Sequence, residues 1–124
     1  MKALVVDDSR AMRMILGRIL KGLGFEIMEA GNGQEALAAI HASGPFDLAL
    51  VDWNMPVMNG LELVQAVRKE HDLDSLRIMM VTTETQPAQL TQALEAGANE
   101  YLMKPFSPEA VAEKLALMGF ASAP

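Results

Sequence analysis

Residues 3–8 are Ala3-Leu4-Val5-Val6-Asp7-Asp8, four apolar residues followed directly by two carboxylates. A short, wholly apolar run of this kind indicates a strand that is covered on both faces. Two further runs have the same character, because residues 48–51 end in Asp52 and residues 78–81 end in Thr82. Strands buried on both faces are typical of parallel sheets, whose carboxyl ends share one edge. The runs therefore predict a parallel sheet with polar groups gathered at one edge.

Longer stretches with helical periodicity separate the apolar runs, which is typical of repeated βα units. The predicted strands lie near residues 2–7, 25–30, 47–52, 77–82 and 99–103. The predicted helices lie near residues 10–22, 34–42, 60–70, 87–96 and 108–118.

Capping signals mark the starts of three predicted helices. Asn32 precedes Glu35 by three positions, and Asn59 precedes Glu62 in the same way. An asparagine cap with a carboxylate three residues later satisfies free backbone N–H groups. Ser107-Pro108 is a cap followed by proline at the first helical position. The Asn-Gly pairs could instead form hairpin turns, but the residues after them are helical in composition, which favours caps.

Charge in the second and fifth predicted strands indicates the strand order. Both strands contain glutamate, whereas the other predicted strands have wholly apolar centres, so the charged strands are expected at the edges. The sequence therefore predicts a flavodoxin-like, doubly wound α/β fold with five parallel strands in the order 2-1-3-4-5 and five helices. Ligands of such sheets bind between strands 1 and 3, at their carboxyl ends. The residues expected there are Asp7, Asp8 and Asp52.

Three carboxylates brought together repel one another, and a divalent cation removes that cost. Magnesium suits a site with one or two direct carboxylates, a carbonyl and a phosphoryl oxygen. The backbone carbonyl of Asn54 is a candidate further ligand, because it lies just after Asp52. The alternative for Asp7 and Asp8 is a pair of helix-capping residues before Ser9.

The same edge carries the groups that phosphoryl transfer requires. Asp52 is the best candidate nucleophile, because a carboxylate can accept a phosphoryl group as an acyl phosphate. Lys104 would place a cation on the phosphoryl oxygens, and Pro105 after it favours an extended backbone at the lysine. Thr82 offers a hydroxyl. Alternatively, Lys104 is a surface lysine before a turn, and Thr82 an ordinary residue at a strand end.

Composition limits the class of protein. A length of 124 residues is typical of one domain, expected over residues 1–120 with a short tail at 121–124 and no attached output domain. The net charge of −6 argues against binding to nucleic acid or to an anionic membrane. No cysteine is present, and no segment is long enough for a signal peptide or a membrane span. We therefore expect a cytoplasmic protein.

Four segments together resemble the receiver domain of two-component response regulators. These segments are residues 5–9, 52–60, 81–84 and 101–106. Within that family, the likeness is greatest to the single-domain regulators of flagellar chemotaxis. The residues that carry this narrower likeness are Trp53, Asn54, Glu84 and Tyr101.

The resemblance implies that a histidine kinase or a small phosphodonor phosphorylates Asp52. It implies Mg²⁺ held by Asp8, Asp52 and the Asn54 carbonyl, with Asp7 acting partly through water. It also implies Lys104 on the phosphoryl group and a cis peptide bond before Pro105.

The resemblance further implies a switch, in which Thr82 moves toward the phosphoryl group and Tyr101 turns inward. Asn54, Thr83 and Glu84 would modulate it. Thr83 replaces a smaller residue, residues 86–89 lack the expected lysines, and Glu100 adds negative charge beside Tyr101.

The implied partners are a histidine kinase and a downstream protein, which could be a flagellar motor switch, a phosphatase or a phosphotransfer protein. The protein itself would be a monomer and a switch, not an enzyme. Alternatives are a phosphorelay shuttle, a regulator of another pathway, or a pseudo-receiver that only binds partners. Haloacid dehalogenase-like phosphatases also use a nucleophilic aspartate, Mg²⁺ and a lysine. They place two acids as Asp-x-Asp on the first strand, however, whereas Asp7 and Asp8 are adjacent.

Overall fold

Strands and helices alternate along the chain in a computed structural model, which describes residues 1–83 and 87–120. The strands are β1 (Lys2–Val6), β2 (Glu26–Ala30), β3 (Leu48–Asp52), β4 (Arg77–Thr82) and β5 (Glu100–Met103). The helices are α1 (Arg10–Gly22), α2 (Gly33–Ser43), α3 (Gly60–Arg68), α4 (Pro87–Ala96) and α5 (Pro108–Leu117), with a short 3₁₀ turn, η1 (His71–Leu73), after α3. Within the described ranges, no helix has both the length and the apolar character needed to cross a membrane.

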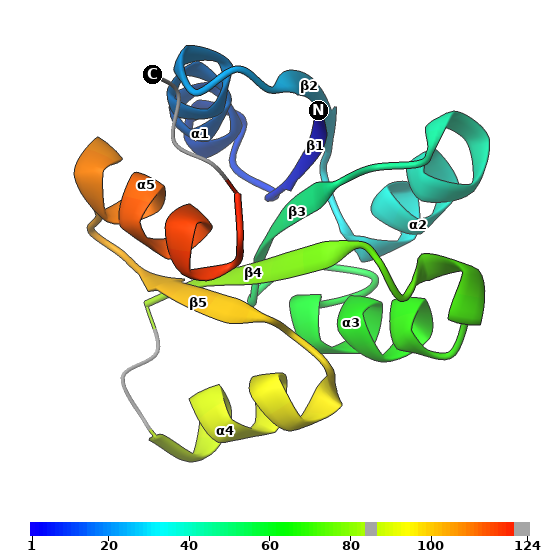
Figure 1. Cartoon of the computed structure of the whole chain (residues 1–124). Helices are drawn as coiled ribbons and strands as arrows, with labels where there is room; N and C mark the ends of the chain where they lie inside the picture. Colours follow the sequence, from blue (N-terminus) through cyan, green and yellow to red (C-terminus); the bar gives the residue numbers. More distant parts are fainter. Residues whose placement is uncertain (84–86, 121–124) are drawn as a thin grey trace.

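The strands form one parallel sheet in the order β2-β1-β3-β4-β5, which confirms the predicted flavodoxin-like topology. Helices α1 and α5 cover one face, and α2, α3 and α4 cover the other (Figure 1). The chain changes direction across the sheet between β1 and β3, so the loops that follow these two strands diverge there.

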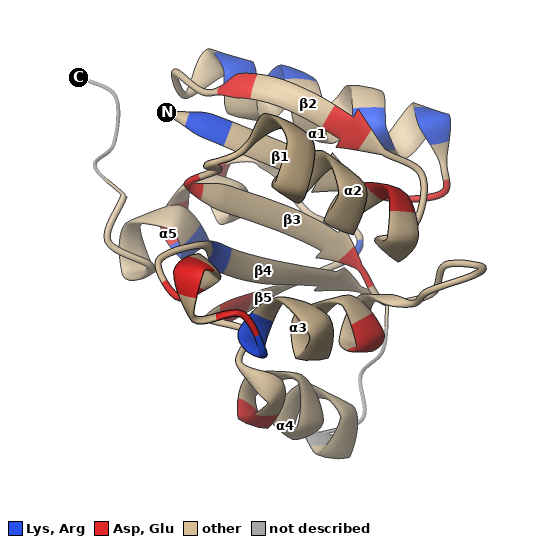
Figure 2. Cartoon of the chain, turned by 90° about the vertical axis from the view of Figure 1, so that its right-hand side faces the viewer, with Lys and Arg blue, Asp and Glu red and all other residues tan. Residues whose placement is uncertain are grey.

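Strand burial explains this order. The apolar residues of β1, β3 and β4 are all buried, whereas most of β2 is exposed. The glutamates of β2 lie on the outer strand (Figure 2). A central strand would place these charges between two helix layers, where their desolvation would be costly. The prediction that the charged strands form the edges is therefore confirmed.

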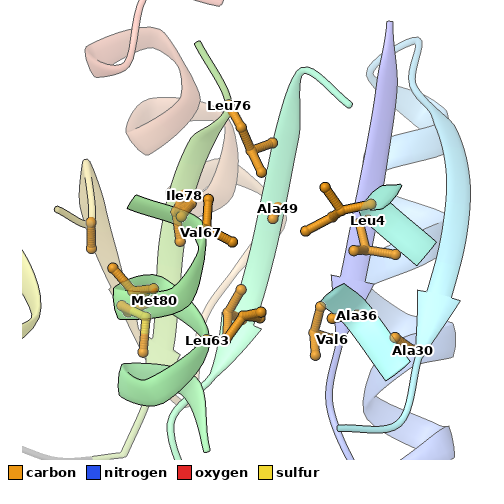
Figure 3. Packing of buried hydrophobic residues seen from close by; sticks show 14 of the residues in the cluster. Leu4, Val6, Ala30, Ala36, Ala49, Leu63, Val67, Leu76, Ile78 and Met80 are labelled. Carbon is orange, nitrogen blue, oxygen red and sulfur yellow. The ribbon is translucent and has the colours of Figure 1, made fainter. Parts of the chain in front are cut away.

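Alternate residues of the inner strands supply two hydrophobic clusters, one on each face of the sheet. Leu4 and Val6 pack on the side of α2 and α3 (Figure 3), whereas Ala3 and Val5 pack on the side of α1 and α5. A strand that is apolar at every position can do this, because successive side chains point to opposite faces. The rigid centre of the sheet therefore fixes where the carboxyl ends of β1 and β3 lie.

Helix starts follow the predicted caps. The side chains of Asn32 and Asn59 accept hydrogen bonds from the N–H groups three residues on, and Ser107 does the same for α5. The backbone N–H of Asn59 also donates to Oε1 of Glu62 at 3.0 Å, which completes a capping box. The hairpin alternative for the Asn-Gly pairs is wrong.

Helix α3 ends at Arg68, two residues before the predicted end. The Arg68 guanidinium donates hydrogen bonds to the carbonyls of Gly97, Leu73 and Leu76 at 2.9, 3.0 and 2.7 Å, and to the Asn99 side chain at 3.0 Å. The chain after the helix therefore wraps around this side chain through η1, instead of continuing as helix. Burial lowers the pKa of Arg68 from its ordinary value. These contacts anchor the end of the sheet opposite to the acidic residues.

Candidate functional site

Asp7, Asp8 and Asp52 come together at the carboxyl edge of the sheet, as predicted. Asp7 directly follows β1 and Asp52 is the last residue of β3, and the two strands pair in register up to Val6 and Val51. One carboxylate oxygen from each of the three acids lies within 4.8 Å of the others. Asp7 and Asp52 are buried, and Asp8 is exposed. The edge of the molecule thus presents a partly enclosed group of acids that is open to solvent at Asp8.

Lys104 directly follows the edge strand β5, and its side chain extends to the same group of acids. Its Nζ lies 3.2 Å from Oδ1 of Asp52 and 3.5 Å from Oδ2 of Asp7. The backbone N–H of Lys104 donates to the carbonyl of Thr82 at 2.9 Å, which extends the pairing of β4 and β5 beyond the last strand residue. The Lys104–Pro105 peptide bond is cis, as the family resemblance implied. The alternative of a free surface lysine is wrong, because the side chain is only 19% exposed.

The capping alternative for the two adjacent aspartates is also wrong. Ser9 is the N-cap of α1, and its hydroxyl accepts from the N–H of Met12 at 3.2 Å. Oδ1 of Asp7 accepts from the N–H of Ser9 at 2.8 Å, so this carboxylate braces the loop ahead of the helix. Asp7 and Asp8 therefore remain directed to the carboxyl edge, and the helix is capped without them.

The electrostatics of the group favour a bound cation. Burial raises the pKa of Asp52 above its ordinary value of 3.8, the neighbouring charge of Asp7 raises it further, and Lys104 opposes both effects. Within the described residues, one ammonium thus faces three clustered carboxylates. Hard oxygen donors with excess negative charge are the ligands that Mg²⁺ prefers. The acids present therefore fit a magnesium ion.

The raised pKa of Asp52 predicts how stability changes with pH. The native state binds more protons than the unfolded state between 3.8 and the higher pKa of the folded state, so stability falls as pH rises through this window. In Mg²⁺-free buffer, Asp52→Asn should therefore be more stable than the wild type at neutral pH, with the difference shrinking toward acid. Urea unfolding at several pH values measures this difference. A variant that is less stable than the wild type at neutral pH contradicts the expectation.

Gly60 allows the chain after β3 to return past Asp52. A Cβ at this position would clash with the backbone oxygen of Asp52 and would lie 2.8 Å from Cε of Met80. The N–H of Gly60 donates to the carbonyl of Trp53 at 3.0 Å, which closes the turn. From the sequence, Gly60 is only the residue after a capping asparagine. The close approach to Asp52 depends on tertiary packing and has no local sequence signal beyond the glycine itself.

Gly60→Ala should lower the free energy of unfolding by about 2 kcal/mol, because the added methyl group must displace the Asp52 backbone or neighbouring core. Gly22→Ala is the matched control, since a Cβ there would have no heavy atom within 4 Å and the residue is helical. Urea denaturation of both variants measures the effect. Equal stability of the two variants would show that the close approach at Gly60 is harmless.

Thr82, Asn54 and Thr83 lie at the end of β4 and in the loops after β3 and β4. Thr82 is buried at the end of β4, one position beyond the residue that pairs with Asp52. Asn54 and Thr83 are exposed in the loops after β3 and β4. Glu84 lies outside the described residues. The metal-binding role of the Asn54 carbonyl and the modulating roles of these side chains stay predictions.

Tyr101 lies on β5 and is half-buried at the edge of the sheet. Nζ of Lys114 lies 4.2 Å from the centre of the tyrosine ring and 3.3 Å from Oε1 of Glu100. The negative charge that Glu100 brings to this surface is therefore paired with a cation from α5. Tyr101 and Lys114 also line a cavity of about 570 Å³ between β5 and α5.

Comparison with known proteins agrees with the predicted family. The sequence profile described as "Response regulator receiver domain" matches residues 3–116. The chain is 46% identical to chemotaxis protein CheY1 of Helicobacter pylori strain J99 over 116 residues, which cover 93% of this chain and 94% of that protein. It is 44% identical to chemotaxis protein CheY of Pseudomonas aeruginosa, with 93% of each chain covered.

A solved structure shows the same likeness. The chemotaxis response regulator CheY4 of Vibrio cholerae superposes with a TM-score of 0.87 at 40% identity, over 94% of this chain and 96% of that one. Both the fold and the predicted likeness to single-domain chemotaxis regulators are thereby confirmed.

Proposed function

The chain belongs to the response regulator receiver domain family, and from this we propose that it is a chemotaxis-type switch that accepts a phosphoryl group on Asp52 from a histidine kinase. One observation carries the proposal: Asp52 lies beside two further carboxylates and the Lys104 ammonium at the edge where the parallel strands end. Receiver domains of the CheY type are signalling switches and not classical enzymes. The phosphorylated residue would thus be both the acceptor and the signal.

The carboxylate of Asp52 would act as the nucleophile. One of its oxygens forms a bond to phosphorus while the bond from phosphorus to the donor breaks, and the donor leaves with that electron pair. Lys104 already contacts Oδ1 of Asp52, so its ammonium is in place to stabilise the charge of the incoming phosphoryl oxygens. Its second contact, with Asp7, keeps the lysine side chain at this edge before transfer.

Mg²⁺ would supply further charge neutralisation when bound to Asp8, Asp52 and the Asn54 carbonyl, with Asp7 acting partly through water. The chain's own contribution is to hold these oxygens together against their repulsion. The buried sheet does this for Asp7 and Asp52, since each is attached to a central strand.

The output would run from Thr82 to Tyr101 along neighbouring strands. Thr82 pairs with Met103, and Tyr101 is two residues before Met103 on β5. A movement of Thr82 toward a phosphoryl group would change the space available to the half-buried tyrosine ring, which would then turn inward. Asn54 and Glu84 would set how fast this state decays, and Thr83 would crowd the path that the Tyr101 ring takes.

The proposed partners are a histidine kinase and a downstream protein, which could be the flagellar motor switch, a phosphatase or a phosphotransfer protein. The matched chemotaxis proteins favour the motor pathway over a phosphorelay shuttle or another pathway. We further propose that the domain spans residues 1–120 and works as a cytoplasmic monomer. We propose no nucleic-acid partner and no membrane insertion, and the net charge of −6 supports this.

Incubation of the whole chain with acetyl phosphate and Mg²⁺ tests the proposal. We expect about one phosphoryl group per chain, bound to the protein and labile to base as acyl phosphates are. Multiple turnover of an added phosphomonoester, with little labelled protein, would instead favour the haloacid dehalogenase-like alternative. No labelling and no turnover would support a pseudo-receiver.

A further inference from the structure

Arg13 links the acidic loop to the edge strand β2. The residue is in the first half of α1, and its side chain is only 18% exposed. Its Nη1 donates to the backbone carbonyl oxygen of Asp7 at 2.6 Å, and its Nε donates to Oε1 of Glu29 at 2.9 Å. Figure 2 shows the basic residues of α1 beside the acidic residues of β2. Two different nitrogens of one rigid guanidinium therefore hold two separate segments.

The contact with Asp7 fixes the peptide that joins the two adjacent aspartates. The carbonyl of Asp7 and the N–H of Asp8 belong to one planar group, so holding the carbonyl restricts the direction in which Asp8 leaves the strand. The N–H of Asp7 is held separately by the carbonyl of Ala30 on β2 at 3.1 Å. Asp8 is the exposed member of the acidic group, so its orientation depends most on this restraint of the backbone.

We infer that Arg13 is a positioning residue for metal binding, which sets the Asp7–Asp8 peptide so that Asp8 faces Asp52, and that Glu29 in turn orients Arg13. The inference rests on the proposed magnesium site. Residues that orient metal ligands typically change metal affinity by tenfold or more when they are removed. Nothing in the local sequence distinguishes Arg13 from the other basic residues of α1, because the role depends on where β2 places Glu29.

Electrostatics alone predicts the opposite change in Mg²⁺ affinity when Arg13 is removed, so the two explanations can be separated by experiment. Arg13 is a cation close to a group of acids, so removing its charge alone should attract Mg²⁺ more strongly. If the guanidinium instead orients Asp8, its removal should weaken Mg²⁺ binding despite the gain in negative charge. Arg18, an exposed residue of the same helix, measures the purely electrostatic effect.

The experiment titrates the whole chain with Mg²⁺ alone, by calorimetry and by the fluorescence of Trp53, which directly follows Asp52. We expect Arg13→Ala to raise the dissociation constant for Mg²⁺ about tenfold. Arg13→Lys should show nearly the same loss, because one ammonium cannot reach both the Asp7 carbonyl and Glu29. Glu29→Ala should show a smaller loss, and Arg13→Ala with Glu29→Ala together no more than Arg13→Ala alone. Arg18→Ala should bind Mg²⁺ as tightly as the wild type or slightly more tightly.

Urea unfolding in Mg²⁺-free buffer separates positioning from a merely structural role. A variant of Arg13 that loses stability but keeps the Mg²⁺ affinity of the wild type overturns the inference, as does tighter binding in Arg13→Ala. If Arg13→Ala does not fold, Glu29→Ala and Arg13→Lys decide the question in the same way. A wild-type chain that binds no Mg²⁺ would refute the proposed metal site itself, so the two failures are distinguishable.

Discussion

Asp52→Asn is expected to take up no phosphoryl group from acetyl phosphate and Mg²⁺, under conditions in which the wild type takes up about one per chain. Asp52 is the last residue of the central strand β3, and its Oδ1 lies 3.2 Å from Nζ of Lys104, nearer than the Asp7 carboxylate at 3.5 Å. An amide of the same size keeps the shape of the site but cannot form the acyl phosphate. The fold should survive, because the uncharged amide removes a carboxylate whose pKa is raised by burial and by Asp7.

Intact-protein mass spectrometry measures this loss, and peptide mapping locates the label in the wild type. Asp72→Asn is the matched control, because Asp72 is an exposed residue of η1, which follows α3 beyond Arg68. That variant should be labelled like the wild type. Full labelling of Asp52→Asn would remove Asp52 as the acceptor and leave the acidic group as a metal site without this role.

Lys104→Ala should separate metal binding from phosphoryl transfer. The ammonium contacts both Asp52 and Asp7, so it competes with Mg²⁺ for Asp52 and offsets part of the negative charge that attracts the ion. Its removal should tighten Mg²⁺ binding several-fold. The same change should slow labelling by acetyl phosphate on the order of 10²-fold, because a cation aimed at the phosphoryl oxygens is lost. Metal affinity and transfer rate would thus move in opposite directions.

Mg²⁺ titration and the rate of labelling measure the two effects on one preparation. Lys21→Ala removes an exposed lysine of α1 and controls for net charge. Any Lys104→Ala protein that becomes phosphorylated should also fail to change the environment of Tyr101, as seen by nuclear magnetic resonance of the labelled ring. A loss of metal binding in parallel with transfer would show that Lys104 holds the acids in place and does not act on the phosphoryl group.

Much of the fold could be predicted because its decisive signals are local. Apolar runs that stop at Asp7, Asp52 and Thr82 mark strands of a parallel sheet, and a parallel sheet places their ends together whatever the loops do. The position of Lys104 followed from the same rule. The caps at Asn32 and Asn59 were equally predictable from the sequence, because capping depends on residues three positions apart.

The features that the sequence did not reveal depend on contacts between distant segments. The Arg68 side chain binds the carbonyls of Leu73, Leu76 and Gly97, and α3 ends there. The periodicity of the helix does not predict these contacts. Arg13 likewise depends on Glu29 from another strand. Gly60 is required by a clash that exists only after the chain has folded back over Asp52. Tertiary packing decided each of these, and local pattern did not.

A crystal structure of the whole chain with Mg²⁺ and beryllofluoride would test directly whether the metal ion and the phosphoryl group share one site at Asp52. We expect one magnesium ion bound by Asp8, Asp52 and the carbonyl of Asn54, with the beryllofluoride on Asp52 and in contact with Lys104. A structure in which Asp8 and Asp52 share no ion, or in which beryllofluoride occupies another residue while Asp52 stays free, would contradict the proposed switch.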